Sequence, residues 1–371
     1  MLSQRFLPDL FVMVLALIAG PVLLWLKPVL RSTIIAGSAL LLGGLIVTLL
    51  QATNHEEAFR WLMISGLAFA WALATVSATL LGLFFRLMPT PPVAPKRRKL
   101  LTLASGAVMA APAAILGYGF LIGRRNFRMQ EVDLAIPGLA PDLDGLRLVQ
   151  LSDIHLSPFI SRADVQWCVD MANEMRPQVA LVTGDLITGV RDSIDDCLQE
   201  LRRLKADAGV LGCMGNHELY VQGERYTAEA AARRGMRFLR SEQTSLRFGS
   251  AVLNVAGVDH QWEKGDYLPD AKALLRPGEF NLLLSHNPDV FPKAAEQGWD
   301  LTLSGHMHGG QINLELANEN LNFMRLTTPY VYGTYRLDRS AIYVTRGIGT
   351  VGMPVRFGAP PEVALIRLRR A

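Results

Sequence analysis

The sequence predicts a layered α/β domain preceded by an all-helical transmembrane region. Beyond residue 130, short apolar runs alternate with stretches of helical character, a pattern typical of α/β folds. The first 123 residues instead hold long apolar runs and only 12 charged side chains, nine basic and three acidic. We therefore divide the 371 residues into a four-helix transmembrane region, 1–123, and an α/β domain, 124–371.

Four apolar stretches in the first region have the length of membrane spans. They are Leu10 to Leu26, Thr33 to Leu50, Trp61 to Phe85 and Leu100 to Ile122. A helix needs about 20 apolar residues to cross the hydrocarbon core of a bilayer. A soluble helical bundle would require a polar face on every helix, and none of the four stretches has one. The sequence therefore predicts a multi-pass protein of the cytoplasmic (inner) membrane.

The distribution of lysine and arginine predicts the orientation of these spans. The segment from Arg86 to Lys99 carries five basic residues, and the first loop adds Lys27 and Arg31. Because basic loops are retained in the cytoplasm, the α/β domain is expected on the extracytoplasmic side. The run Arg97-Arg98-Lys99 before apolar sequence also resembles a twin-arginine export signal, which predicts the same side.

Charge and cysteine content narrow the functional classes. The net charge of +4 comes from the first region, because residues 124–371 hold 28 basic and 30 acidic side chains. No nucleic-acid partner is therefore expected. The three cysteines, Cys168, Cys197 and Cys213, lie in apolar or helical contexts that are typical of core packing.

The second region shows helix and strand signals in alternation. Ser161 is a candidate N-cap with Asp164 three residues later, which predicts a helix from Ser161 to Met175. Further helices are predicted over 193–205, 226–234 and 288–297, and further strands over 246–248, 252–256, 341–345 and 363–368. This alternation supports the α/β assignment.

The most informative stretch runs from Ser304 to Gln311, where two histidines stand between glycines after a short apolar run. His306 and His308 are two residues apart, so they would share one face of an extended segment. The glycines allow the backbone to turn sharply and a substrate to approach the main chain. Two imidazole nitrogens can thus face one cavity.

Four other polar motifs follow apolar runs in the same way. They are Asp153-Ile154-His155, Gly184-Asp185, Gly215-Asn216-His217-Glu218 and Ser285-His286-Asn287. Five of the seven histidines of the chain belong to this series, and only His55 and His260 lie outside it. Histidines of an ordinary core would not line up behind five successive strands, so the series indicates a functional site.

These motifs resemble those of the calcineurin-like metallophosphoesterases, and most of all the membrane-associated bacterial phosphodiesterase branch. The resemblance spans about residues 145–368 and includes the tail from Arg346-Gly347-Ile348-Gly349 to Pro361-Glu362. It implies a four-layer αββα sandwich, in which two stacked mixed sheets are flanked by helices. The first 123 residues lie outside the resemblance.

The candidate ligands comprise two carboxylates, one amide and four imidazoles, a mixture that suits Mn, Fe or Zn and disfavours calcium or structural zinc. Seven ligands are too many for one ion with an open position, so two divalent metal ions are expected. The resemblance implies the following distribution: Asp153, His155 and His308 on one ion, Asn216, His286 and His306 on the other, and Asp185 between them. Two such ions would generate a bridging hydroxide that attacks the phosphate.

His217 has a different implied role. By resemblance it is not a ligand but a catalytic residue that stabilises the phosphate and protonates the leaving oxygen. The alternative is a hydrogen-bond partner of a ligand. Many relatives have an acidic residue where this chain has Thr188, and Glu218 is a candidate to compensate for it.

Other polar residues near the motifs have less specific interpretations. His260 is expected at the rim of the pocket and not among the ligands. Arg346 and Arg356 could bind a phosphate, although arginines at loop ends are often structural.

Three functional hypotheses follow from these residues. The first is a membrane-anchored phosphodiesterase that uses two metal ions and acts on a phosphate-ester substrate. The second is a hydrolase of phospholipid or lipid pyrophosphate, whose substrate the spans would help to present. The third is a non-catalytic membrane sensor with a metal-binding fold, which the complete ligand set disfavours. The residues that would contact the leaving group lie on loops, and their sequence does not distinguish the first hypothesis from the second.

Overall fold

The computed structural model describes residues 75–76, 78–80, 82–84, 87, 95–262, 267–316 and 319–371. The chain divides into two compact units, one formed by residues 1–122 with 352–355 and the other by 123–351 with 356–371. All candidate site residues belong to the second unit.

The described part of the first unit contains helix α4 (Pro95–Leu121). This helix overlaps the fourth predicted span, Leu100 to Ile122, so the prediction of helix there is confirmed. Among the residues that the structure describes, no helix is long and apolar enough to cross a membrane. The first two predicted spans and most of the third lie outside the described residues.

The second unit contains two six-stranded mixed sheets, which confirms the predicted pair of sheets. The strand order of the first sheet is β1 (Arg128–Ile136), β14 (Glu362–Arg370), β2 (Arg147–Leu151), β3 (Val179–Thr183), β4 (Val210–Cys213) and β5 (Met236–Phe238). The order of the second sheet is β12 (Gly333–Leu337), β13 (Ser340–Val344), β9 (Leu301–Ser304), β8 (Phe280–Leu284), β7 (Ala251–Gly257) and β6 (Glu242–Phe248). A separate hairpin pairs β10 (Leu314–Leu316) with β11 (Glu319–Leu321).

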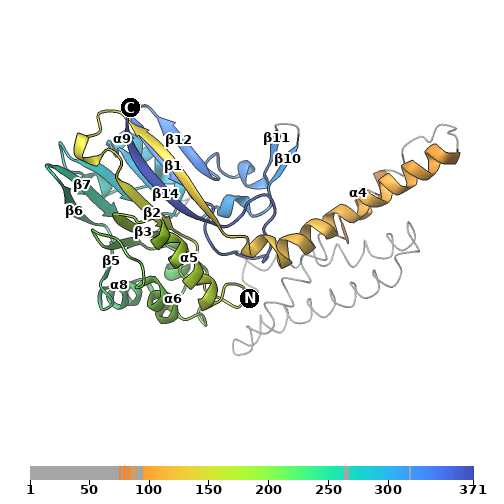
Figure 1. The fold of residues 1–371 in the computed structure, drawn as a ribbon, viewed down its shortest axis with the longest axis horizontal. Coiled ribbons are helices and arrows are strands. Elements are labelled where there is room, and N and C mark those ends of the chain that lie inside the picture. The colour runs from red at the N-terminus through yellow and green to blue at the C-terminus, as the bar shows by residue number, and fades with distance from the viewer. Residues whose placement is uncertain are drawn as a thin grey trace. The chain divides into compact units, whose positions relative to one another are not determined.

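Helices cover the outer faces of both sheets. The α-helices of this unit are α5 (Arg162–Glu174), α6 (Ile194–Leu201), α7 (Asn216–Tyr220), α8 (Glu224–Ala232) and α9 (Phe291–Gln297). The short 3₁₀ helices are η2 (Gly123–Arg125), η3 (Pro141–Leu143), η4 (Ala271–Leu274), η5 (Pro288–Val290), η6 (His308–Gly310) and η7 (Phe323–Leu326). Helices α5, α6 and α8 lie on one side of the first sheet (Figure 1). Helix α9 and the residues that flank it pack on the second sheet through Val290 of η5, Ala294 of α9 and Trp299. The result is the expected four-layer arrangement.

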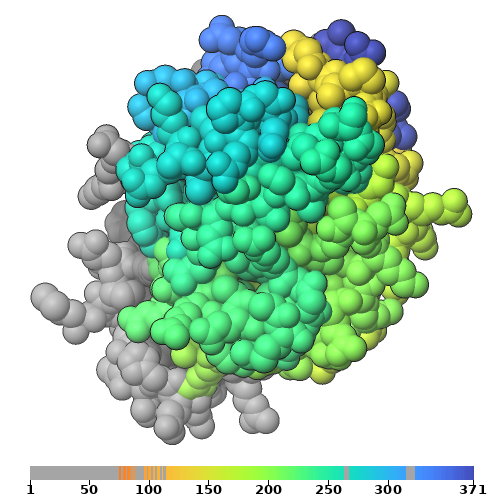
Figure 2. Space-filling view, turned by 90° about the vertical axis from the view of Figure 1, so that its left-hand side faces the viewer, coloured from red at the N-terminus to blue at the C-terminus, as the bar shows by residue number. Residues whose placement is uncertain are grey.

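Side-chain alternation along the central strands builds these layers. Leu148 and Leu181 point into the core between the two sheets, whereas Val149 and Val182 point towards the helices. Strands buried on both faces require continuous apolar runs, which explains the pattern seen in the sequence. The edge strand β6 instead contains only exposed and half-buried residues. Figure 2 shows the side of the molecule on which β6 and β7 lie in Figure 1, and green and cyan atoms from the middle of the chain form most of it.

Local signals place the helix ends. Ser161 accepts a hydrogen bond from the Asp164 amide and Asp164 accepts one from the Ser161 amide, so the predicted capping box is present. The helix predicted over 193–205 ends earlier, at Leu201, and the one predicted over 226–234 begins at Glu224. The sequence patterns therefore located the elements but not every boundary.

Strands β2, β3 and β4 run parallel to one another, as do β7, β8 and β9. The carboxyl ends of each set therefore lie at one edge of their sheet. The Gln150 side chain joins the two sheets there, because its Nε2 donates to Thr183 Oγ1 at 2.8 Å and to the Ser304 carbonyl at 3.0 Å. All the candidate motifs follow strands of these two sets.

We expect residues 124–371 to fold without the first region and to stay soluble without detergent. The hydrophobic clusters between and outside the sheets consist of residues of this part, and 58 of its 248 residues are charged, against 12 of the first 123. Circular dichroism should show one cooperative thermal transition. Aggregation of this fragment without a cooperative transition would mean that the first region completes its core.

Candidate metal centre

The structure gathers the predicted site residues at the carboxyl ends of five strands. Asp153 and His155 follow β2, Asp185 follows β3, and Asn216 begins α7 after β4. From the second sheet, His286 follows β8, and His306 and His308 follow β9. Motifs separated by up to 155 positions in the sequence therefore meet in one place, as the parallel strands require.

The first group of ligand atoms belongs to Asp153, His155 and His308, which lie within 4.8 Å of one another. His155 Nε2 is 3.2 Å from His308 Nε2, and His308 Nε2 is 3.3 Å from Asp153 Oδ1. All three side chains are buried. This is the set that the resemblance implied for one ion.

Asp185 lies between this group and the second one. Its Oδ2 is 3.5 Å from His155 Nε2 and 3.0 Å from His286 Nε2. Its Oδ1 accepts a hydrogen bond from the His217 amide at 2.9 Å. One carboxylate oxygen thus faces ligand atoms of both groups, as a bridging ligand must.

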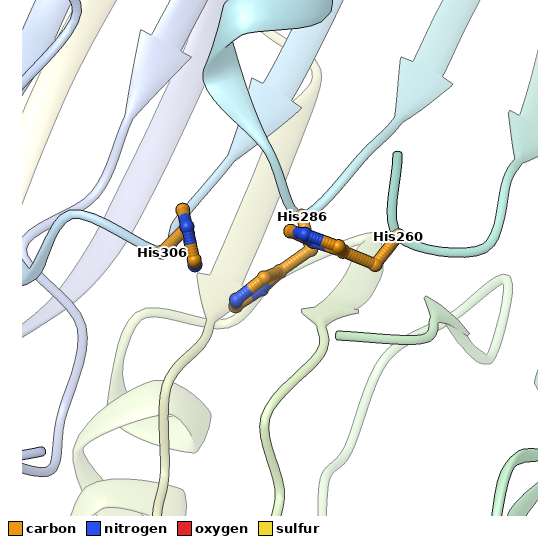
Figure 3. Close-up of side chains that lie close together, drawn as sticks. All are labelled: His260, His286 and His306. Carbon is orange, nitrogen blue, oxygen red and sulfur yellow. The ribbon is translucent and has the colours of Figure 1, made fainter. Parts of the chain in front are cut away.

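The second group contains His286 and His306, and His260 joins them (Figure 3). The side chain of His260, which the sequence placed at the rim of the pocket, is buried. Asn216 is also buried, and its Oδ1 has no hydrogen-bond partner.

Contacts with backbone carbonyls fix which ring nitrogen of His286 and of His217 faces the centre. His286 Nδ1 lies 2.6 Å from the Thr183 carbonyl, and His217 Nδ1 lies 2.6 Å from the Thr188 carbonyl. A carbonyl can only accept, so both Nδ1 atoms carry the proton. The Nε2 atoms of both rings are thereby directed to the site, and for the candidate ligand His286 an orienting contact of this kind strengthens metal binding.

Burial and the attraction of neighbouring imidazoles set the charges of the carboxylates of Asp153 and Asp185. Burial raises the pKa of Asp153 to about 6, although His286 opposes this shift. Burial acts on Asp185 in the same direction, but the positive charge of His286 outweighs it and holds the pKa of Asp185 well below the usual value. Asp185 is therefore an anion at neutral pH.

The imidazoles divide into neutral and positively charged rings. Burial lowers the pKa of His155 to about 3 and that of His306 to about 4, and it holds the pKa of His308 well below its usual value. These neutral rings offer a lone pair. Burial also acts to lower the pKa of His286, but Asp185 and Asp153 raise it to about 10. A divalent cation bound at His286 would replace that proton and be attracted by the same carboxylates.

The residues fit two divalent cations. The buried Asn216 Oδ1 lacks a partner, and buried polar atoms in proteins are otherwise almost always bonded. The remaining donors are carboxylates and imidazoles, the ligands that borderline divalent ions bind. Asp153, His155 and His308 would hold one ion, Asn216, His286 and His306 the other, and Asp185 both.

The backbone at the ligands is strained. Five of the candidate ligands have positive φ angles between 49° and 73°: Asp153, His155, Asp185, His306 and His308. Such conformations cost about 1–3 kcal/mol each and persist only where surrounding structure enforces them. The loops after β3 and β4 are also packed closely together at Asp185. A Cβ at Gly215 would lie 2.1 Å from Asp185 Oδ1, so only glycine fits there. The site is thus held in place by the fold.

Glu218 has a supporting role that differs from the one suggested by sequence. Its buried carboxylate accepts hydrogen bonds from the amides of Asp185, Leu186 and Gly215 at 2.7–2.9 Å. The hypothesis that Glu218 orients the His217 ring in place of an acidic residue at 188 is wrong. The Thr188 carbonyl does so, and Glu218 joins the loops after β3 and β4.

The two arginines are structural. The fully buried guanidinium of Arg356 donates to five backbone carbonyls, those of His308, Arg346, Gly347, Gly349 and Ala359. Burial lowers its pKa to about 10. Arg346 pairs with the buried carboxylate of Glu362 at 2.5 Å. The suggestion that they bind phosphate is not supported by these contacts. Those of Arg356 instead fix the loop that carries His308, and that of Arg346 joins the segment after β13 to the start of β14.

An aromatic pair beside His217 was missed by sequence reasoning. The ring centres of His217 and Tyr220 are 5.3 Å apart, and those of Tyr220 and Trp262 are 5.5 Å apart. Tyr220 is 40% and Trp262 48% exposed, so both can contact a substrate. The spacing of three residues between His217 and Tyr220 on one helix was a usable signal, whereas Trp262 comes from a distant loop.

A layered fold with paired carboxylate and histidine ligands at its strand ends is that of a metal-dependent hydrolase, and comparison with known proteins identifies the family. The model of the calcineurin-like phosphoesterase family matches residues 146–310. The uncharacterized metallophosphoesterase YkuE of Bacillus subtilis (strain 168) is 31% identical over 277 residues, which cover 72% of this chain and 93% of that protein. The chain belongs to the calcineurin-like phosphoesterase family.

Two further relatives carry informative names. A protein of Danio rerio, named transmembrane protein with metallophosphoesterase domain, is 30% identical over 74% of this chain and 63% of its own length. Phosphodiesterase YaeI of Escherichia coli (strain K12) is 27% identical over 60% of this chain and 82% of its own length. The match to the Danio rerio protein thus leaves over a third of that protein uncovered.

Replacing Asp185 by Asn should lower both metal content and turnover. The neutral amide removes the charge that would hold two cations together, and we expect turnover to fall by about a hundredfold or more. Elemental analysis and phosphoester hydrolysis measure the two effects. Asp170→Asn, which removes a carboxylate that is 55% exposed on α5, serves as the control. Full metal content in the Asp185 variant would contradict the bridging role.

Proposed function

We propose that the protein is a membrane-anchored phosphodiesterase that uses two divalent metal ions. The observation that carries the proposal is the position of Asp185 Oδ2, which lies within 3.5 Å of Nε2 atoms of both ligand groups. Family membership supports phosphoester hydrolysis, and the name of the E. coli relative supports a diester substrate.

In the proposed reaction, Asp185 and His217 have different roles. Bound divalent cations would supply Lewis acidity and an activated water for attack on phosphorus. Asp185 anchors the centre, and its own position is fixed by Glu218 and by the His217 amide. The His217 ring is 12% exposed, and its Nε2 lies 4.0 Å from Asp185 Oδ2. From there a doubly protonated ring can give its Nε2 proton to the leaving oxygen and become neutral, while the Nδ1 proton stays bound to the Thr188 carbonyl.

The membrane anchor rests on the four apolar stretches of the first region and on the transmembrane designation of the Danio rerio relative. The basic segment from Arg86 to Lys99 supports a cytoplasmic position for that loop. The domain with the metal centre would then lie outside the cytoplasm.

A lipid phosphate ester is the second candidate substrate. The exposed ring of Tyr220 packs against His217, and the exposed ring of Trp262 packs against Tyr220. This row of rings therefore begins at the residue that would protonate the leaving group. Aromatic side chains with one polar end suit an apolar group next to water. This arrangement favours a substrate with a large apolar or aromatic substituent.

Turnover of a substrate panel by the full-length protein tests the proposal. We expect hydrolysis of phosphodiesters to exceed that of the matching monoesters, to stop after chelation and to return with Mn²⁺. Lipid phosphates in mixed micelles test the second candidate. Faster cleavage of monoesters, or turnover that survives chelation, would overturn the proposed reaction.

His217→Ala should lower turnover by about a hundredfold or more and leave the metal content unchanged, since general acid catalysis contributes about that much. Good leaving groups need little protonation, so the loss should be smaller for a nitrophenyl ester than for an alkyl ester. Steady-state rates on both esters, with elemental analysis, measure this. Equal losses on both esters, or a lost ion, would instead make His217 an electrostatic support or a ligand.

A further inference from the structure

Three neighbouring parallel strands deliver three imidazoles to one point. His260 lies three residues beyond the end of β7, His286 two beyond β8 and His306 two beyond β9. Since β7, β8 and β9 are adjacent and parallel, their carboxyl ends lie at the same edge of the second sheet. Figure 3 shows the three rings converging from separate loops.

The spacing of the rings is that of three ligands on one ion. The ring centres are 5.1 Å apart for His260 and His306, 5.1 Å for His286 and His306, and 5.7 Å for His260 and His286. One nitrogen of each ring lies within 4.8 Å of the others. Imidazoles bound to a common ion at about 2 Å, with angles of about 90–110° between them, would have ring centres about 4.5–5 Å apart.

His260 has an unpartnered ring nitrogen that can serve this purpose. The side chain is 6% exposed, and its Nδ1 is buried without a hydrogen-bond partner. A histidine with only a packing role would normally satisfy such an atom. The ring is held from the other side by Trp262, whose ring centre is 4.8 Å away at an interplanar angle of 77°.

We propose that His260 is a further ligand of the ion held by Asn216, His286 and His306. This inference rests on the two-ion centre of the proposed function. The second site then has three imidazoles, whereas the first has two, from His155 and His308. Because imidazole suits zinc and iron and oxygen ligands suit manganese, the two positions differ in metal preference, and the second position selects the nitrogen-preferring ion.

The test follows Co²⁺ binding to the metal-free, full-length protein by calorimetry and by the visible absorption of the bound ion. Wild type should bind two ions. His260→Ala should weaken one binding step by at least tenfold, since loss of even an outer partner of a ligand costs about 10–100-fold. The other step should be unchanged, and the absorption band of the weakened site should shift. His260→Asn, which keeps a small polar side chain, should show the same selective loss.

Trp262→Leu is the matched control, because it removes the packing partner of His260 and keeps the imidazole. It should retain both binding steps within about threefold. Unchanged affinities and spectra in both His260 variants would overturn the inference and leave the two-ion centre intact. Equal weakening in Trp262→Leu would also overturn it, by making the effect one of packing. A wild type that binds fewer than two ions would overturn the proposed function itself, and this inference with it.

Discussion

The buried carboxylate of Asp185 is the constraint on which the rest of the site depends. The residue is 1% exposed and carries a negative charge, and an isolated charge would be very unfavourable in such a place. Imidazoles of His155 and His286 surround one oxygen, and the His217 amide bonds the other. Glu218 fixes the loop through three amides. The attraction that stabilises this anion is the attraction that would concentrate two cations beside it.

The ligand groups combine residues of both sheets, so the site exists only when the sheets are stacked. Asp153 and His155 come from the first sheet and are completed by His308 from the second, and Asp185 of the first sheet faces His286 of the second. The leucine-rich core between the sheets holds these loops at fixed separation. Any change that shifts one sheet against the other would therefore separate ligands of both groups before it exposed the core.

The strained backbone is a second consequence of this arrangement. Positive φ angles at five ligands would relax in a free loop, but here each loop is held by the buried strand that precedes it and by hydrogen bonds to neighbouring loops. The guanidinium of Arg356 adds to this restriction by binding five carbonyls around His308, a role that requires its complete burial. Stability of the layered core is thus used to hold ligands in geometry that they would not adopt alone.

Sequence alone determined the α/β class, the central strands and the motifs at their ends, because strands buried on both faces and parallel pairing impose local, readable patterns. It also indicated the motifs that contain the seven candidate ligands, as each motif follows an apolar run, and the family resemblance implied which residues of these motifs are ligands. Only the tertiary structure showed the Thr188 carbonyl beside His217, the burial of Arg356 and the convergence of His260 with His286 and His306. Some of these contacts join loops that are 26 or more positions apart, and others are made by backbone atoms, which every residue has. The residue types around a position in the sequence therefore cannot predict them.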